Sequence, residues 1–171
     1  MPSTGETSCM QGVRYPIVLD SLTHNFVTGE IEHVIHQVFV SERSDVVILE
    51  GQGGITHPAR LGGLELVAAG RPDAIVLQHA PERGFYYDLT QYPISSLERE
   101  VQILELLSQK QLIALTLNHE GISDEGSDET IKNYEAIYSR PATDVLKFGC
   151  ERLVQEIEGI FSDRLRSVAR G

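Results

Sequence analysis

A six-residue apolar run, Leu112-Ile113-Ala114-Leu115-Thr116-Leu117, ends at Asn118-His119 and decides the fold. A short, uninterrupted run of this kind is typical of a β-strand that is buried on both faces of a parallel sheet. Two more runs have the same form: residues 46–49, which end at Glu50-Gly51, and residues 74–77, which end at Gln78-His79. We therefore expect three buried strands.

Helical patterns lie between and after these strands. Residues 94–107 repeat apolar side chains with the 3.6-residue period of a helix, and Ser95 with Glu98 predicts a capping box at its start. Apolar stripes over residues 26–38 and 150–161 predict two more helices.

A shorter helix is expected after the acidic segment 120–129, around Tyr134 and Tyr138. Asp128 and Glu129 would then lie favourably near the positive end of its dipole, with the residues before them in a solvated loop. Strands that alternate with helices indicate right-handed βαβ units. The predicted fold class is α/β, with three layers: a mainly parallel sheet and helices on both of its faces.

Composition points to one domain. The chain has 171 residues, of which 41% are hydrophobic and 23% charged, and no long-period repeat. Glycines and prolines interrupt the first residues, so we expect an irregular N-terminal segment over residues 1–23 and a single α/β domain over residues 24–171.

The excess of acidic over basic residues argues against two classes of partner. A net charge of -11 opposes binding to nucleic acid and to anionic membranes, and no apolar run approaches the ~20 residues of a membrane helix. The first ten residues do not resemble a signal peptide, and Cys9 and Cys150 are too few for a disulfide framework. We expect a cytoplasmic protein with reduced cysteines and a small-molecule substrate.

Ligands of open parallel sheets bind beyond the carboxyl ends of the strands. Three predicted loops begin there, at Glu50, Gln78 and Asn118, and they carry His57, His79 and His119. The alternative is that these histidines are ordinary polar loop residues. We take His79, His57 and Glu50 as candidate catalytic residues and Asn118 as a candidate ligand contact.

The richest of these loops reads Glu50-Gly51-Gln52-Gly53-Gly54-Ile55-Thr56-His57-Pro58. Closely spaced glycines let the backbone approach a ligand, and successive amides can form an anion-binding nest. Glu50, directly after a strand, has the position of an acidic residue that holds magnesium in many phosphate-binding proteins. The alternative is a tight strand-to-helix turn with Glu50 bonded to backbone.

The second loop combines His79 with Arg83, which suits a carboxylate or phosphate ligand, although a surface pair of Arg83 with Glu82 is an equal alternative. His33 and His36 are expected to be solvated. The sequence has no G-x-x-x-x-G-K-S/T motif and no G-x-S-x-G elbow, so hydrolase chemistry has little support.

The Gly-rich loop resembles a known family through its E-G-Q-G-x-x-x-H-P block, together with Arg71-Pro72-Asp73-Ala74-Ile75-Val76-Leu77-Gln78-His79. This is the C-terminal P-loop-type domain of a bacterial and archaeal family of unknown function, some members of which are D-glutamate N-acetyltransferases. Ser3-Thr4-Gly5-Glu6-Thr7 is similar to the family's A-T-G-Q-T-G segment. A weaker similarity runs from Glu50-Gly51-Gln52-Gly53-Gly54 to the E-G-A-G-G turn of dethiobiotin synthetases.

The resemblance implies a P-loop NTPase-like fold without the first strand and the Walker A loop. It also implies acetyl transfer from acetyl-CoA to an acidic amino acid. In that reaction His79 or His57 would be the base, the amides of Gly53 and Gly54 would stabilise the oxyanion, and Arg83 would bind the substrate carboxylate. The other implied ligand contacts are Gly51, Gln52, Pro58, Thr4, Gly5 and Thr7.

Two alternatives stay open. One is an ATP- and magnesium-dependent ligase or kinase-like P-loop protein, a nucleotide-binding function in which Glu50 holds the metal. The other is a non-catalytic fragment. We expect a homo-oligomer, and the non-catalytic fragment would assemble through the sheet edge that a first strand would cover.

Overall fold

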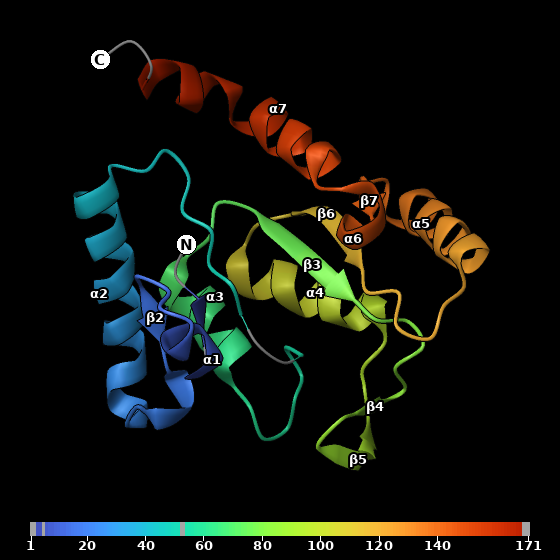
Figure 1. Ribbon diagram of the computed structural model, residues 1–171, viewed down its shortest axis with the longest axis horizontal. Helices are drawn as coiled ribbons and strands as arrows, with labels where there is room; N and C mark the ends of the chain where they lie inside the picture. Colours follow the sequence, from blue (N-terminus) through green and yellow to red (C-terminus); the bar gives the residue numbers. More distant parts are fainter. Residues whose placement is uncertain (1–2, 5, 52–53, 169–171) are drawn as a thin grey trace. The chain divides into compact units, whose positions relative to one another are not determined.

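The computed structural model describes residues 3–4, 6–51 and 54–168 of the chain (Figure 1). The chain divides into two compact units. Met1–Pro72 and Leu106–Ser108 form the first unit, and Asp73–Glu105 and Gln109–Gly171 form the second. Within the described residues, no helix is both long enough and apolar enough to cross a bilayer.

The first unit is mainly helical. Its two longer helices are α2 (His24–Glu42) and α3 (Gly62–Gly70). Short elements fit between the glycines and prolines of the N-terminal segment. They are β1 (Ser3–Thr4), α1 (Glu6–Met10), β2 (Pro16–Ile17), which pairs with β1 in parallel, and the 3-10 helix η1 (Leu19–Ser21).

The core of the first unit is built on one face of α2. Its buried side chains are Val27, Ile31, Val34 and Val38, at the spacing that a helix requires to place them on one stripe. The helix predicted over residues 26–38 is confirmed, except that Phe26 is exposed and Val27 takes its place in the core. Four residues from other elements complete the buried cluster around Val27, Ile31 and Val34: Ile17, Leu19, Leu66 and Ala69.

The prediction of a buried strand at residues 46–49 is wrong. The structure assigns no strand to these residues, and Val46 and Ile48 are exposed. A β-branched apolar run favours the extended conformation, but a strand exists only where its backbone pairs with a neighbour. Leu49 instead lies against Gly70. A Cβ atom added at Gly70 would come within 2.4 Å of the Leu49 Cδ1 atom.

The second unit contains a parallel sheet in the order β3 (Ile75–His79), β6 (Leu112–Leu117), β7 (Ala142–Thr143). All six residues of β6 are buried, as predicted. β3 extends two residues further than predicted and is not buried on both faces, because Val76 and Gln78 are exposed. The predicted α/β fold class is confirmed.

Four helices and a hairpin complete the second unit. The helices are α4 (Leu97–Ser108, whose last turn groups with the first unit), α5 (Asp124–Tyr138), α6 (Val145–Phe148) and α7 (Glu151–Val168). β4 (Phe85–Tyr86) and β5 (Leu89–Pro93) form the antiparallel hairpin. α5 contacts β6 and β7, and α7 contacts β6.

Two helix starts differ from the prediction by a few residues. Ser96, not Ser95, caps α4, and its hydroxyl accepts a hydrogen bond from the Arg99 amide. α5 begins at Asp124, where Ser123 caps it, so part of the expected acidic loop is helical. Ser and Asp favour the first positions of helices because their side chains satisfy the free amides there.

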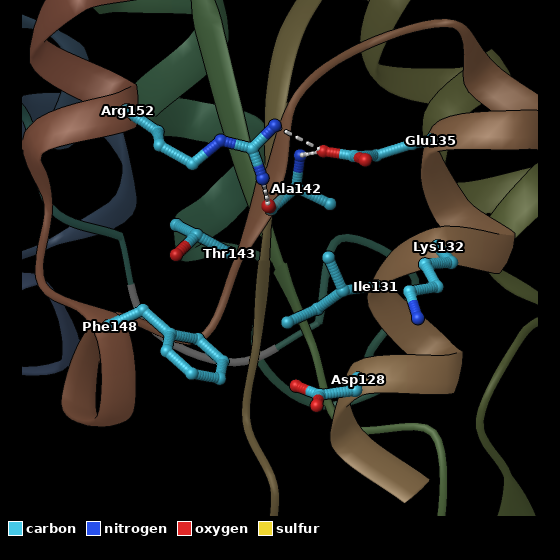
Figure 2. A pocket seen from close by; sticks show the side chains of 8 residues that line it. All are labelled: Asp128, Ile131, Lys132, Glu135, Ala142, Thr143, Phe148 and Arg152. Carbon is cyan, nitrogen blue, oxygen red and sulfur yellow. Dashed lines mark hydrogen bonds and ion pairs between the residues drawn. The ribbon is translucent and has the colours of Figure 1, made fainter. Parts of the chain in front are cut away.

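The outer edge of the sheet is closed by two side chains. The Ala142 amide donates to Glu135 Oε1 at 3.1 Å, and the Ala142 carbonyl accepts from Arg152 Nη1 at 2.8 Å. Arg152 Nη2 also donates to the same Glu135 oxygen at 2.6 Å (Figure 2). The backbone groups of β7 that no strand pairs are therefore satisfied, which leaves this edge unable to accept another strand at Ala142.

We expect Arg152→Met to destabilise the protein by about 1–2 kcal/mol, because the Ala142 carbonyl loses its charged donor. Urea denaturation measures this change. The matched control is Arg140→Met, because Arg140 donates to Gln111 on the surface, and a change within about 0.5 kcal/mol is expected there. Equal losses in the two variants would contradict the assigned role of Arg152.

Candidate functional site

The three parallel strands of the second unit end at one edge, and polar residues follow each of them. His79 is the last residue of β3, Asn118 and His119 follow β6, and Asp144 follows β7. We call these four residues, together with Tyr134 of α5, the carboxyl-end cluster. The sequence predicts that the loops beginning at Gln78 and Asn118 lie at this edge, and the structure brings these two loops together.

His119 and Asp144 form a hydrogen-bonded pair. His119 Nδ1 lies 2.5 Å from Asp144 Oδ2, and Asp144 is fully buried while the His119 side chain stays 35% exposed. The second oxygen, Asp144 Oδ1, accepts the Leu146 amide at 3.1 Å and thereby caps α6. A carboxylate held at both oxygens orients the imidazole, and the other nitrogen, Nε2, has no hydrogen-bond partner among the described residues.

His79 is paired with a tyrosine. Its Nδ1 atom lies 2.5 Å from the hydroxyl of Tyr134, which is buried in the third turn of α5. Burial lowers the pKa of the His79 imidazole, so the ring is neutral at neutral pH. Burial, and then the charge of Tyr138, raise the pKa of Tyr134 to about 12, so the hydroxyl keeps its proton.

Backbone contacts tie the two loops of the cluster together. The Asn118 amide donates to the His79 carbonyl at 2.8 Å, and Asn118 Oδ1 accepts the Glu120 amide at 3.1 Å. Arg83 forms an exposed ion pair with Glu120, rather than the pair with Glu82 that was the alternative expected from the sequence. Such an exposed pair is weak, which leaves Arg83 free to exchange it for a ligand carboxylate.

A lysine lies beside the cluster. Lys147 Nζ contacts Asp124 Oδ1 at 2.5 Å and Ser127 Oγ at 2.9 Å. The ammonium lowers the pKa of the exposed Asp124 carboxyl, mainly through this hydrogen bond. Lys147 thus ties α6 to the first turn of α5, which fixes the helix that Asp144 caps.

The remaining predicted site residues belong to the first unit. Glu50, Gly51 and Pro58 are exposed, while His57 is buried. His57 Nδ1 accepts the Ala59 amide at 3.2 Å, so a neutral His57 carries its proton on Nε2 and has no free lone pair to act as a base. His57 lies in a turn closed by its own amide, which donates to the Gly54 carbonyl at 3.0 Å.

Some predicted contacts lie outside the described residues. These are Gln52, Gly53 and Gly5, and nothing is described of the Thr4 side chain. Thr7 is exposed in α1. Among the described residues, no group of three or more His, Cys, Asp or Glu side chains is arranged to hold a metal ion, so magnesium at Glu50 stays a prediction.

Sequence reasoning missed Asp144 and Tyr134. Asp144 follows a strand of two residues, which is too short to produce an apolar run, and the sequence around Tyr134 predicts only a helix. The sequence does carry one signal that could identify Asp144: an aspartate directly before an apolar turn is a typical helix N-cap.

A hollow of about 330 Å³ lies next to the cluster, but it does not include either histidine pair. It is the space between α5, β7 and the start of α7 in Figure 2, and Ile131, Thr143 and Phe148 line it. Its two ionic groups nearest the sheet, Glu135 and Arg152, are those that close the β7 edge. The candidate site is therefore the cluster and not this hollow.

The lowered pKa of His79 predicts a pH-dependent stability. The unfolded chain takes up this proton near pH 6.5, while the folded protein does so only at lower pH. The stability that the neutral His79 allows is therefore fully present above about pH 6.5 and is lost as the pH falls. In urea denaturation between about pH 7.5 and about pH 5.5, the wild type should lose more stability than His79→Asn, which keeps a polar atom near Tyr134. Parallel curves would contradict the burial of a neutral His79.

Known proteins match nearly the whole chain. A D-glutamate N-acetyltransferase of Tritonibacter scottomollicae is 27% identical over 165 residues, which cover 92% of this chain and 48% of that protein. A second D-glutamate N-acetyltransferase, from a Pseudoalteromonas species, is 26% identical over 148 residues, which cover 82% of this chain and 43% of that protein. The chain thus spans about half the length of these curated relatives.

The fold and the family are also shown. The crystal structure of a DUF1611 family protein from Anabaena variabilis matches 93% of this chain and 48% of that chain, with a TM-score of 0.82 and 20% sequence identity, which shows the α/β fold. The family model of a domain of unknown function, the DUF1611_C P-loop domain, matches residues 1–154. The chain belongs to the DUF1611 family of P-loop domains.

Proposed function

We propose that this chain takes part in acetyl transfer from acetyl-CoA to the amino group of an acidic amino acid, with His119 as the general base. The observation that carries the proposal is the His119–Asp144 pair at the carboxyl end of a parallel sheet. Two relatives that cover most of the chain are named D-glutamate N-acetyltransferases, which supports D-glutamate as the substrate class.

The reaction needs a base in a definite position. The ammonium of the acceptor first gives up one proton to solvent. The resulting amine nitrogen attacks the thioester carbonyl carbon, the carbon–sulfur bond breaks, and a second proton leaves the nitrogen. His119 Nε2 takes this proton and returns it to the departing sulfur, so that CoA leaves as a thiol. Asp144 holds the ring and stabilises the imidazolium that forms in between. Arg83, exposed at the same edge, would bind a carboxylate of the acceptor.

Ligand binding to the chain is the first test of the proposal. A ligand at about 100 times its Kd stabilises the native state by about 2.7 kcal/mol, which raises the melting temperature. We expect this shift with acetyl-CoA and without added metal. A magnesium-dependent shift with ATP alone would favour a ligase or kinase-like function and overturn the proposal. No shift with either ligand would favour a non-catalytic role for this chain.

Turnover tests the assigned base. The release of CoA thiol from acetyl-CoA should depend on D-glutamate, and His119→Gln should lower kcat by about 100-fold or more, because glutamine cannot accept the proton. The matched control is His33→Gln, an exposed histidine on α2, which should leave kcat unchanged. Full activity in His119→Gln would exclude His119 as the base.

A further inference from the structure

The two histidines of the carboxyl-end cluster face partners of different chemistry at the same ring atom. His119 Nδ1 faces a carboxylate oxygen, and His79 Nδ1 faces a phenol hydroxyl. A neutral imidazole carries a single proton, on Nδ1 or on Nε2, and the partner of one nitrogen decides the state of the other. The pairings therefore determine what each ring offers to a ligand at Nε2.

Asp144 decides the state of His119. A carboxylate oxygen only accepts hydrogen bonds, so His119 Nδ1 must carry the proton that bridges the 2.5 Å contact. The Nε2 atom of the neutral ring then has a free lone pair. Asp144 cannot turn away from this role, because its other oxygen is held by the Leu146 amide.

Tyr134 decides the state of His79. A hydroxyl can donate and accept, but Tyr134 is buried, and His79 Nδ1 is the one hydrogen-bond partner of its hydroxyl among the residues that the structure describes. A buried hydroxyl proton needs an acceptor, and Nδ1 supplies it only when unprotonated. The raised pKa of Tyr134 agrees with a hydroxyl that keeps and donates its proton. The proton of neutral His79 then lies on Nε2.

We propose that the two rings are held in opposite tautomers, so that His119 offers a base at Nε2 while His79 offers an N–H donor to the oxyanion of acetyl transfer. This role for His79 rests on the proposed function. When the amine attacks, the carbonyl electron pair moves to oxygen, and His79 Nε2–H stabilises that charge without losing its proton. His79 would thus be a donor instead of the base expected from the sequence, with Tyr134 and Asp144 as positioning residues.

Imidazole tautomers can be read without any turnover. Long-range proton–nitrogen NMR of the full chain, labelled with ¹⁵N-histidine, distinguishes the two nitrogens of each ring well above the usual histidine pKa of about 6.5. His79→Gln and His119→Gln assign the signals. We expect protonated Nε2 in His79 and protonated Nδ1 in His119. The same tautomer in both rings, or protonated Nδ1 in His79, would overturn the inference.

Two variants test the positioning residues. In Asp144→Asn the amide oxygen stays with the Leu146 amide, so the NH2 group faces His119 and should move its proton to Nε2. In Tyr134→Phe the donor to His79 is lost, and we expect a mixture of tautomers in that ring alone. Unchanged tautomers in both variants would mean that neither partner positions its histidine.

Measurements of kcat then distinguish whether His79 acts as a hydrogen-bond donor or as a base. Glutamine places an amide N–H near the position of the imidazole Nε2–H, while asparagine is too short, so His79→Gln should retain about tenfold more kcat than His79→Asn. No such rescue is expected for His119→Gln. Equal losses in the two His79 variants would exclude the donor role. Opposite tautomers without acetyl transfer would refute the proposed function alone.

Discussion

The parallel pairing of β3, β6 and β7 is the constraint on which the second unit depends. β6 is buried along its whole length, so each of its backbone groups must find a partner within the protein, and the neighbouring strands provide it. Apart from Thr116, β6 carries only apolar side chains, and polar side chains follow directly after the strand ends. Because the strands run in the same direction, His79, His119 and Asp144 reach one edge.

The same helix serves the sheet and the candidate site. Tyr134 and Glu135 are consecutive residues of α5, and successive side chains of a helix point about 100° apart. Tyr134 therefore reaches His79 while Glu135 reaches the Ala142 amide at the edge of β7. A displacement of α5 would disturb the edge and the His79 pair together, so the closure of the sheet also holds the histidine in place.

Sequence patterns predicted the elements whose evidence is local. β6, α2, α4 and α7 carry long periodic or uninterrupted apolar patterns, and each is present. The patterns failed where pairing decides the outcome: residues 46–49 have the composition of a strand but no strand assignment, and β7 is a strand with only two residues. Ser95 and Ser96 are residues of the same type, so the sequence does not distinguish them, and only the helix geometry selects Ser96 as the cap.

For the site, the residues alone determined that His79 and His119 lie at strand ends, whereas the strand expected before His57 is absent, and the Gly-rich block indicated the family that the comparisons show. They did not determine what each histidine does. His79 and Tyr134 are 55 residues apart in the chain, and His119 and Asp144 are 25 apart. Only the tertiary structure selects these partners, because a hydrogen bond depends on where the helices and strands bring two side chains, and no local pattern records that position.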